Sequence, residues 1–347
     1  MRFADNRNKI GKYIPAVVFL IFIYGMALWF IFSPKPDYSS SEKRYLQKFP
    51  EVTAEKLLSG DFGSEFETFF ADRFPQRNTW VGLNAYTALA EGNNGASGVY
   101  NCKNGYLINK PVSIENNLDK NIGAVADFAK SIDTPTTVML VPSTGYIVDD
   151  VLPTFHDKYN DDEDISKISS TLSKDKIGFV DLRERFKSEY KNGSQLYYKT
   201  DHHWTTKGAY TGYQELCKAL GITPIDDSTL KKDSYPDFYG TTYSSSGFWL
   251  TPPDNIEIWN NPKNSDRNIS VKITEGANIK TSGSMYFTDH LKEDDKYPVF
   301  IDGNHALTEI TNTNAKNGTI LLIKDSFSHS LAPVSYTHLT LPTTSRV

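Results

Sequence analysis

The feature that most constrains this chain is an uncharged apolar segment from Tyr13 to Phe32. Its 20 residues are about the length that an α-helix needs to cross a bilayer. The residues before it carry four basic side chains and one acid, a bias that keeps an N-terminus in the cytoplasm. The sequence therefore predicts a cytoplasmic stretch over 1–12, a transmembrane signal anchor over 13–32, and an extracytoplasmic remainder on a single-pass protein of the cell membrane.

A cleaved signal peptide is the alternative for this segment. Such peptides have a shorter apolar core and a small-x-small cleavage site, whereas this segment ends in bulky residues from Trp29 to Phe32. We therefore favour a retained anchor. The remaining chain has two cysteines, Cys102 and Cys217, which fit no metal-ligand spacing and are interpreted as free thiols, with one disulfide as the alternative. Few cysteines in an exported chain indicate a bacterial cell envelope.

Between the anchor and the main domain, residues 33–105 predict a linker and a helical region. A short Pro/Ser linker precedes Ser41–Pro50, which we interpret as a brief helix that ends at the proline. Phenylalanines at helical spacing between Phe62 and Phe70 predict an amphipathic helix, and a further helix follows over 80–89.

From residue 106 to 333 the pattern alternates between strand and helix. Short β-branched runs predict strands over 136–141, 177–182, 196–199 and 319–323, whereas helices are predicted over 183–190 and 206–220. Asp233 to Asn260, rich in Tyr, Ser, Gly and Pro, is interpreted as a loop-like insert. This alternation predicts an α/β fold, a mostly parallel sheet with helices on both faces.

Two segments of this domain carry candidate catalytic residues just after predicted strands. In the run Thr200 to Thr206, Asp201 precedes His203 by two residues, so the carboxylate can orient the imidazole as a general base. Ser326 follows the last predicted strand at the start of a helix, where it can act as a nucleophile. Because ligand sites in such sheets lie beyond the carboxyl ends of strands, we expect the two segments to meet. If the first segment is extended, His202 faces away from His203.

Other interpretations of the same residues stay open. Asp325 or Ser326 suits a helix N-cap. Asp201, His202 and His203 could bind a metal, joined by Asp289-His290 or His305, although no zinc-type spacing is present. We therefore predict no metal and no cofactor. The net charge of −5 argues against a nucleic-acid partner.

The Asp201-His202-His203-Trp204 run resembles the signature of the bacterial DHHW protein family, which in turn resembles the SGNH hydrolase-like acetyltransferases of alginate O-acetylation, AlgJ and AlgX. The similarity extends from about Ser41 to Pro333. The matching segments are Ser41 to Leu46, Asp72 to Arg77, Gly105 to Leu107, Thr200 to Thr206, Phe238 to Gly240, Gly303 to His305 and Lys324 to Ser326.

The resemblance implies a fold, an activity and a set of site residues. It implies a circularly permuted SGNH-like domain and an extracytoplasmic O-acetyltransferase of a cell-surface polysaccharide, supplied with acetyl groups by a membrane-bound O-acyltransferase. Ser326, His203 and Asp201 take the catalytic roles, with Asn304 as oxyanion donor. The alternatives are an SGNH-type carbohydrate esterase or deacetylase, and a non-catalytic glycan-binding assembly factor. Candidate sugar-binding residues are Trp204, Trp249 and Tyr243.

The last residues, 334–347, depart from the family pattern and resemble translated adaptor read-through after a truncation. We therefore expect a non-native tail there and exclude His338 from functional arguments. On this interpretation, packing behind Ser326 and a terminal sheet element are missing, and the chain itself is poorly stable or inactive.

Overall fold

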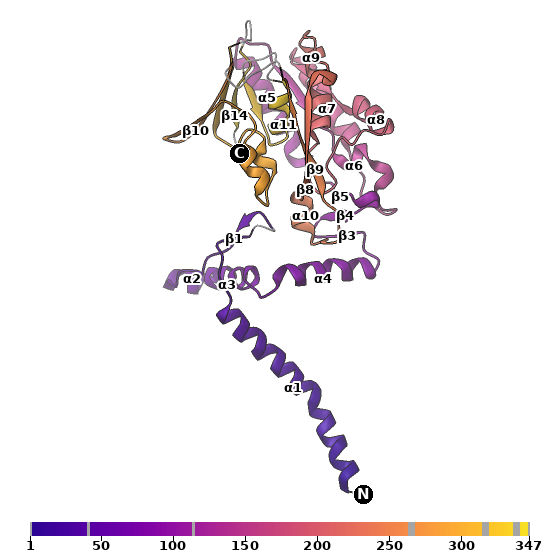
Figure 1. The fold of residues 1–347 in the computed structure, drawn as a ribbon, viewed down its shortest axis with the longest axis vertical. Helices are drawn as coiled ribbons and strands as arrows, with labels where there is room; N and C mark the ends of the chain where they lie inside the picture. Colours follow the sequence, from indigo (N-terminus) through magenta and orange to yellow (C-terminus); the bar gives the residue numbers. More distant parts are fainter. Residues whose placement is uncertain are drawn as a thin grey trace. The chain divides into compact units, whose positions relative to one another are not determined.

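The computed structural model describes residues 2–39, 42–112, 115–262, 268–313, 319–335 and 341–345. The chain forms two compact units, residues 1–84 and 85–347, and each is described by itself. Figure 1 labels the α-helices and many of the strands.

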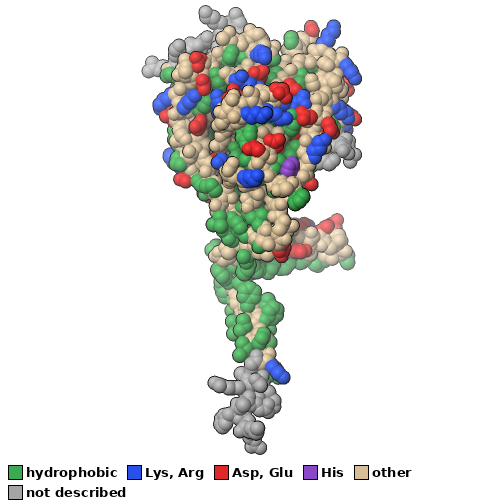
Figure 2. Space-filling view, turned by 90° about the vertical axis from the view of Figure 1, so that its right-hand side faces the viewer, with side chains coloured by type: hydrophobic (Ala, Val, Ile, Leu, Met, Phe, Trp, Pro, Cys, Tyr) green, Lys and Arg blue, Asp and Glu red, His purple; other side chains and the backbone are tan. Residues whose placement is uncertain are grey.

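Unit 1 begins with the long helix α1, Arg2–Phe32. Within it, Lys12–Phe32 has a mean hydropathy of 2.4, and none of its residues is buried. Figure 2 shows hydrophobic side chains around this helix. In the part of the chain that the structure describes, it is the one helix long and apolar enough to cross a membrane. An exposed apolar helix of this length fits a membrane anchor or a signal sequence.

The rest of unit 1 is mainly helical. Its elements are β1 (Tyr38–Ser39), β2 (Arg44–Tyr45), α2 (Ala54–Ser59), α3 (Asp61–Asp72) and α4 (Arg77–Ala90), the last of which continues into unit 2. The helices predicted from the phenylalanine spacing and over 80–89 are confirmed as α3 and α4.

The helix predicted over Ser41–Pro50 is wrong for the described residues, which begin at Glu42. Arg44–Tyr45 instead pairs with Tyr38–Ser39 in an antiparallel ladder. The Tyr38 and Tyr45 rings lie 5.3 Å apart across it. Cross-strand aromatic contacts of this kind stabilise a strand pair and compete with the weak propensity of a short helix.

Two segments that carry the family resemblance bind each other in unit 1. Arg44 donates from Nη1 to Asp72 Oδ2 at 3.0 Å and from Nη2 to Asp72 Oδ1 at 2.5 Å. The Gln47 backbone N–H donates to Asp72 Oδ2 at 2.8 Å, and Arg77 forms an ion pair with Glu42. The Asp72 segment thus holds the Arg44 segment against the end of α3, which gives both motifs a structural role.

Replacing Asp72 with asparagine should weaken the contact between the Asp72 and Arg44 segments. The Arg44 hydrogen bond holds the pKa of Asp72 below its ordinary value, so the stabilisation is present above about pH 4 and is lost as pH falls. Because the Arg44 side chain is 41% exposed, we expect a loss of only about 1 kcal/mol. Faster proteolysis within residues 42–77 of the full chain in micelles would show it, whereas the exposed Glu67→Gln on the same helix should leave the rate unchanged. Equal rates for both variants would contradict the assignment.

Unit 2 alternates strands and helices. Its helices and short helical turns are η1 (Lys103–Gly105), α5 (Glu115–Ser131), α6 (Thr144–Ile147), η2 (Asp149–Val151), α7 (Asp161–Lys174), α8 (Arg183–Lys191), α9 (Thr206–Ala219), η3 (Asp227–Thr229), α10 (Thr241–Ser246), η5 (Thr288–Lys292), η6 (Tyr297–Val299) and α11 (Ser328–Ser335). The helices predicted over 183–190 and 206–220 are confirmed as α8 and α9.

The strands of unit 2 form four sheets among the described residues. The first sheet contains β3 (Gly95–Ala96), β4 (Val99–Asn101) and β5 (Leu107–Asn109), and two further sheets are the pairs β6 (Thr137–Leu140) with β7 (Gly178–Asp181) and β8 (Lys231–Phe238) with β9 (Asp254–Asn260). The largest sheet contains β10 (Ile269–Glu275), β11 (Asn278–Ser282), β12 (Leu307–Asn312), β13 (Leu322–Lys324) and β14 (Leu341–Ser345). Its strand order is β11-β10-β12-β14-β13.

The prediction of an α/β fold is confirmed, but its mostly parallel sheet is not. Among the described residues only β6–β7 and β13–β14 pair in parallel, and the other ladders are antiparallel. The segment Asp233–Asn260 is not a loop, since β8 and β9 form an antiparallel hairpin around α10. Ile256 and Ile258 alternate with polar residues and are buried, so the period of two outweighs a loop-like composition.

Two stretches near the predicted domain boundaries form strands in the sheets of unit 2. Residues 85–105, assigned from the sequence to the N-terminal region, lie in unit 2, where β3 and β4 pair with β5. Residues 341–345, in the segment expected to be foreign, form β14, whose backbone lies between β12 and β13.

The largest core cluster of unit 2 joins α8, α9 and α11 to the segment that carries the candidate acid and base. Phe186, Tyr197, Trp204, Tyr213 and Leu331 are all 1% exposed or less within it. Burial of aromatic rings of this size fixes the backbone of the segment that carries Asp201 and His203.

Candidate active site

Asp201 and His203 lie at the tip of a short hairpin-like loop. The Thr205 N–H donates to Leu196 O at 2.8 Å, and the Tyr198 N–H donates to His203 O at 3.2 Å. The strand predicted over 196–199 is one arm of this loop rather than a member of a larger ladder. The loop therefore presents its acid and base at a tight turn.

A buried carboxylate holds the base of this turn. Asp254 is 5% exposed and accepts from Lys199 N at 3.0 Å and from Gln195 Nε2 at 3.0 Å through Oδ1. Its Oδ2 accepts from Thr200 N at 2.8 Å and Thr200 Oγ1 at 2.7 Å. Burial raises the pKa of Asp254, and these donors oppose that rise. The hydrogen bonds to Asp254 thus fix the backbone of the residues that precede Asp201.

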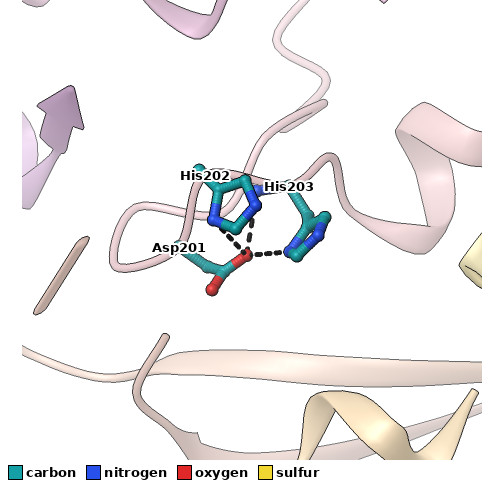
Figure 3. Close-up of side chains that lie close together, drawn as sticks. All are labelled: Asp201, His202 and His203. Atoms are coloured by element: carbon teal, nitrogen blue, oxygen red, sulfur yellow. Dashed lines mark hydrogen bonds and ion pairs between the residues drawn. The ribbon is translucent and has the colours of Figure 1, made fainter. Parts of the chain in front are cut away.

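Asp201 binds His203 by side chain and backbone. Its Oδ1 lies 2.5 Å from His203 Nδ1 and accepts from the His203 N–H at 2.9 Å. Figure 3 shows the carboxylate facing the imidazole. Because Nδ1 binds a carboxylate, the proton of the neutral ring is assigned to Nδ1, and Nε2 is left as an acceptor.

The other oxygen of Asp201 binds the start of α10. Oδ2 accepts from Thr241 N at 2.7 Å and from Thr241 Oγ1 at 3.2 Å. Burial raises the pKa of Asp201, but the electrostatic attraction and the hydrogen bond of His203 outweigh this effect, so the net pKa of Asp201 lies below its ordinary value. Gly240 is required here because a Cβ at this position would overlap Asp201. Asp201 is therefore an ionised carboxylate in a fixed orientation.

His202 does not face away from His203, so that prediction is wrong. The two rings lie 3.8 Å apart, centroid to centroid, and Figure 3 shows both on the same side of Asp201. His202 Nδ1 lies 2.5 Å from Thr241 Oγ1. The prediction assumed an extended segment, whereas the hydrogen bond from His203 N to Asp201 makes it a turn.

Ser326 meets His203 from the other end of the sequence. It lies in the turn between β13 and α11, and its Oγ is 2.7 Å from His203 Nε2. Asp325 takes the capping role that the sequence left open, since its Oδ1 accepts from Phe327 N at 3.0 Å. The Ser326 hydroxyl is thereby left for His203, and a continuous hydrogen-bonded line runs from Ser326 through His203 to Asp201.

Trp204 is part of the support of this line. It is 0% exposed, and its Nε1 donates to Phe327 O at 2.8 Å and to Ser330 Oγ at 2.9 Å. No face of the indole is open to a sugar, so this structure corrects its place among the sugar-binding candidates. The residue that follows the base instead binds the turn that follows the nucleophile.

Sequence reasoning missed two further residues beside the line. Tyr297 stacks on the His203 ring with centroids 4.0 Å apart and planes at 10°, and its hydroxyl donates to Ser326 O at 3.1 Å. His329 is 2% exposed, and burial with the nearby Lys324 lowers the pKa of His329 to about 2. His329 is therefore neutral. No local sequence pattern marks either residue.

The remaining candidates lie on the surface or near it. Tyr243 is half-buried in α10 with its ring 4.2 Å from that of Tyr239. Trp249 is 40% exposed, and its ring lies 5.4 Å from that of Tyr86. Asn304 is exposed, and within the described residues no hydrogen bond joins it to Ser326 or His203.

Asp201, His202 and His203 could also be metal ligands by distance, since one donor atom of each lies within 4.8 Å of the others. Both oxygens of Asp201 already accept hydrogen bonds, and the Nδ1 atoms of both histidines are engaged. A cation would have to displace these donors, so the arrangement suits proton transfer better than metal binding. His290 and His305 bind carboxylates elsewhere, Glu293 and Glu275 respectively.

We compared the sequence and the fold of the chain with those of known proteins. Residues 110–236 match the model of the SGNH hydrolase-like domain of the acetyltransferase AlgX. A DHHW family protein from Eubacterium siraeum is 17% identical, with a TM-score of 0.58 over 72% of this chain and 83% of that chain. PatB1 from Bacillus cereus, solved with a sulfonyl adduct, is 18% identical, with a TM-score of 0.59 over 71% and 84%. No curated protein sequence matches the chain.

At this level of identity the likeness to solved structures shows the fold. The family resemblance drawn from the Asp201 to Trp204 run is confirmed, because a DHHW protein is among the similar structures and the AlgX domain model matches the segment that contains this run. The chain therefore carries an SGNH hydrolase-like α/β domain of the type found in AlgX and shared in fold with DHHW proteins and PatB1.

Proposed function

We propose that this chain is a membrane-anchored O-acetyltransferase that modifies a cell-surface polysaccharide on the extracytoplasmic side. The observation that carries the proposal is the line Ser326 Oγ–His203 Nε2 at 2.7 Å and His203 Nδ1–Asp201 Oδ1 at 2.5 Å. The match to an acetyltransferase domain model supports acetyl as the transferred group.

Ser326, His203 and Asp201 can catalyse acyl transfer in two steps. Ser326 Oγ attacks the acetyl carbonyl while His203 Nε2 takes its proton, and His203 then returns that proton to the leaving group. A sugar hydroxyl attacks the acetyl–serine ester next, and its proton passes through His203 to Ser326. Asp201 stabilises the imidazolium in both steps because its carboxylate is ionised and bound to Nδ1.

The acetyl donor and the acceptor come from outside this domain. A membrane-bound O-acyltransferase would deliver the acetyl group at the extracytoplasmic surface, to which the apolar helix over 12–32 would hold the enzyme. Asn304, in the turn after η6, is the candidate oxyanion donor.

The side chains of Tyr243 and Trp249, which we call the aromatic surface, belong to the insert that binds Asp201 and are candidates for binding a sugar acceptor. Thr241 binds Asp201, and two residues later the Tyr243 N–H donates to Thr200 O at 3.0 Å. The Tyr243 ring and the exposed Trp249 ring on the same insert offer faces on which a sugar can stack.

A second candidate function is carbohydrate ester hydrolysis, in which water replaces the sugar hydroxyl. Ser326 is half-exposed, which leaves room for water to reach the acyl–enzyme. A non-catalytic glycan-binding assembly factor would use the aromatic surface alone.

These functions separate in one assay of the full chain in detergent micelles. An aryl acetate serves as donor, and a panel of de-acetylated polysaccharide fragments serves as acceptor. We expect acetylated fragments in the mass spectrum, and aryl release that increases with acceptor concentration. Free acetate without acetylated fragments would assign an esterase. Fragment binding without aryl release would overturn the enzyme in favour of an assembly factor.

A further inference from the structure

Tyr297 lies outside the acid, base and nucleophile segments and contacts both His203 and Ser326. Its ring lies parallel to the His203 imidazole, with centroids 4.0 Å apart and planes at 10°. Its hydroxyl donates to the backbone oxygen of Ser326 at 3.1 Å. His203 and Ser326 are 123 residues apart, so this contact joins two distant segments through a third.

The ring of Tyr297 is itself held in place. It is 7% exposed, and the Phe300 and Phe238 rings lie 5.4 Å and 6.5 Å from it. The backbone of η6 is tied to the neighbouring segment, because Phe287 N donates to Val299 O at 2.8 Å. A residue fixed in this way can limit how far the imidazole rotates.

The two contacts act on different parts of the same geometry. The stacked ring blocks rotation of His203 about its side-chain bonds, and its negative face favours the positive charge that the imidazole gains when it takes a proton. The hydroxyl fixes the carbonyl of Ser326, which sets the turn and thus the direction of Oγ. If Tyr297 served only to fill space, its ring would be enough, and a hydroxyl that donates to the Ser326 carbonyl would not be needed.

We propose that Tyr297 is a positioning residue that keeps His203 Nε2 and Ser326 Oγ within hydrogen-bond distance. The inference rests on the proposed function, because it assumes that His203 activates Ser326. Tyr297 is buried and does not touch the substrate in this assignment. Its loss should therefore lower kcat and leave KM nearly unchanged.

Sulfonylation of Ser326 tests the inference without the natural substrate. With phenylmethylsulfonyl fluoride, the Ser326 Oγ–sulfur bond forms, the sulfur–fluorine bond breaks, His203 takes the proton and fluoride leaves. The rate is measured by intact mass on the full chain in micelles. We expect Tyr297→Leu to react about 10- to 100-fold more slowly, because small misplacements of a base cost about this much. Tyr297→Phe keeps the stack but loses the hydrogen bond to Ser326 O, so it should react about two- to fivefold more slowly than the unmodified protein.

Two controls separate positioning from simple loss of packing. Tyr100→Leu removes another buried tyrosine, which lies in β4 and is 2% exposed; its hydroxyl donates to Asp157 Oδ2 at 2.6 Å and accepts from Asp157 N at 2.7 Å. It should destabilise the fold about as much as Tyr297→Leu but leave the sulfonylation rate unchanged. If Tyr297→Leu does not fold, Tyr297→Met supplies the same test, together with the proton NMR signal of His203, which should lose its ring-current shift in Met and keep it in Phe.

The possible outcomes distinguish this inference from the proposed function. Absence of labelling at Ser326 in the unmodified protein would overturn the catalytic assignment itself. Labelling that is equally fast in the unmodified protein, Tyr297→Phe and Tyr297→Leu would overturn the positioning role and leave the proposed function standing. An equal slowing by Tyr100→Leu would show general loss of packing and overturn the inference as well.

Discussion

Replacing Ser326 with alanine should abolish acyl transfer and sulfonylation. The substitution removes the Oγ that lies 2.7 Å from His203 Nε2 and leaves the backbone turn in place. Loss of a catalytic serine reduces kcat by about 10⁴- to 10⁶-fold, with the remainder due to binding and electrostatic stabilisation. Aryl acetate turnover and intact mass after sulfonyl fluoride treatment measure both effects on the same sample.

Ser328→Ala is the matched control for this change. Ser328 is half-exposed, lies two residues beyond Ser326, and opens α11. Its loss should change turnover and labelling by less than about threefold, the scale of one hydrogen bond. If Ser326→Ala is still labelled, the reactive residue is not Ser326, and this result would contradict the proposed mechanism. In a host that expresses the protein, unchanged acetyl-ester content of the surface polysaccharide with Ser326→Ala would argue against the proposed substrate.

The second large effect is expected at Gly240, which itself makes no contact with substrate in this assignment. Its φ of −95° is open to any residue, so the backbone does not require glycine. The requirement is space, because a Cβ here would overlap both Cβ and Oδ2 of Asp201. In Gly240→Ala we expect Asp201 to be displaced and His203 to lose its orientation. We expect kcat to fall about 100-fold or more.

A second glycine substitution controls for general effects of added volume. Gly123 lies inside α5, and nothing stands within 4 Å of a Cβ added there. Gly123→Ala should keep full turnover and raise the free energy of unfolding by up to about 1 kcal/mol, as alanine favours a helix. Full activity in Gly240→Ala at an unchanged melting temperature would show that Asp201 tolerates displacement, contrary to the geometry described.

The chemistry of the candidate site could be inferred from sequence because its three residues follow simple local rules. Asp201 and His203 are close in sequence, and the turn that joins them needs only the hydrogen bond from the His203 N–H. Ser326 follows a short β-branched strand, and the end of such a strand is where a nucleophile gains exposure. Their meeting was a consequence of topology, not of any sequence signal that links the two segments.

The parts that sequence reasoning missed depend on contacts between distant segments. Tyr297 lies in a short turn without a motif, and only the folded chain shows its ring against His203. The orientation of His202 was wrong because a hydrogen bond to a side chain converted an extended segment into a turn. The loop predicted over Asp233 to Asn260 is instead the hairpin β8–β9, because the alternation of buried Ile256 and Ile258 with polar residues outweighs the loop-like composition.

Some of the segments that carry the family resemblance contact each other in the structure. The Ser41 to Leu46 and Asp72 to Arg77 segments meet through Arg44 and Asp72. The Phe238 to Gly240 segment meets the Thr200 to Thr206 segment through Gly240 and through Phe238 O, which accepts from Thr200 Oγ1 at 3.2 Å. Spacing along the chain gives no hint of these pairings, because each joins residues 28 to 40 positions apart.

The wide separation of His203 and Ser326 also has a consequence for biosynthesis. Ribosomes add about 5–20 residues per second, so the 123 positions between the two take roughly 6–25 s to synthesise. During this interval a nascent chain can fold the turn that holds Asp201 and His203, but it still lacks the Ser326 hydroxyl. In the proposed enzyme, the growing polypeptide is therefore unreactive while it emerges and moves across the membrane. Reactivity towards acyl esters starts only after the strand that carries the serine has joined its sheet.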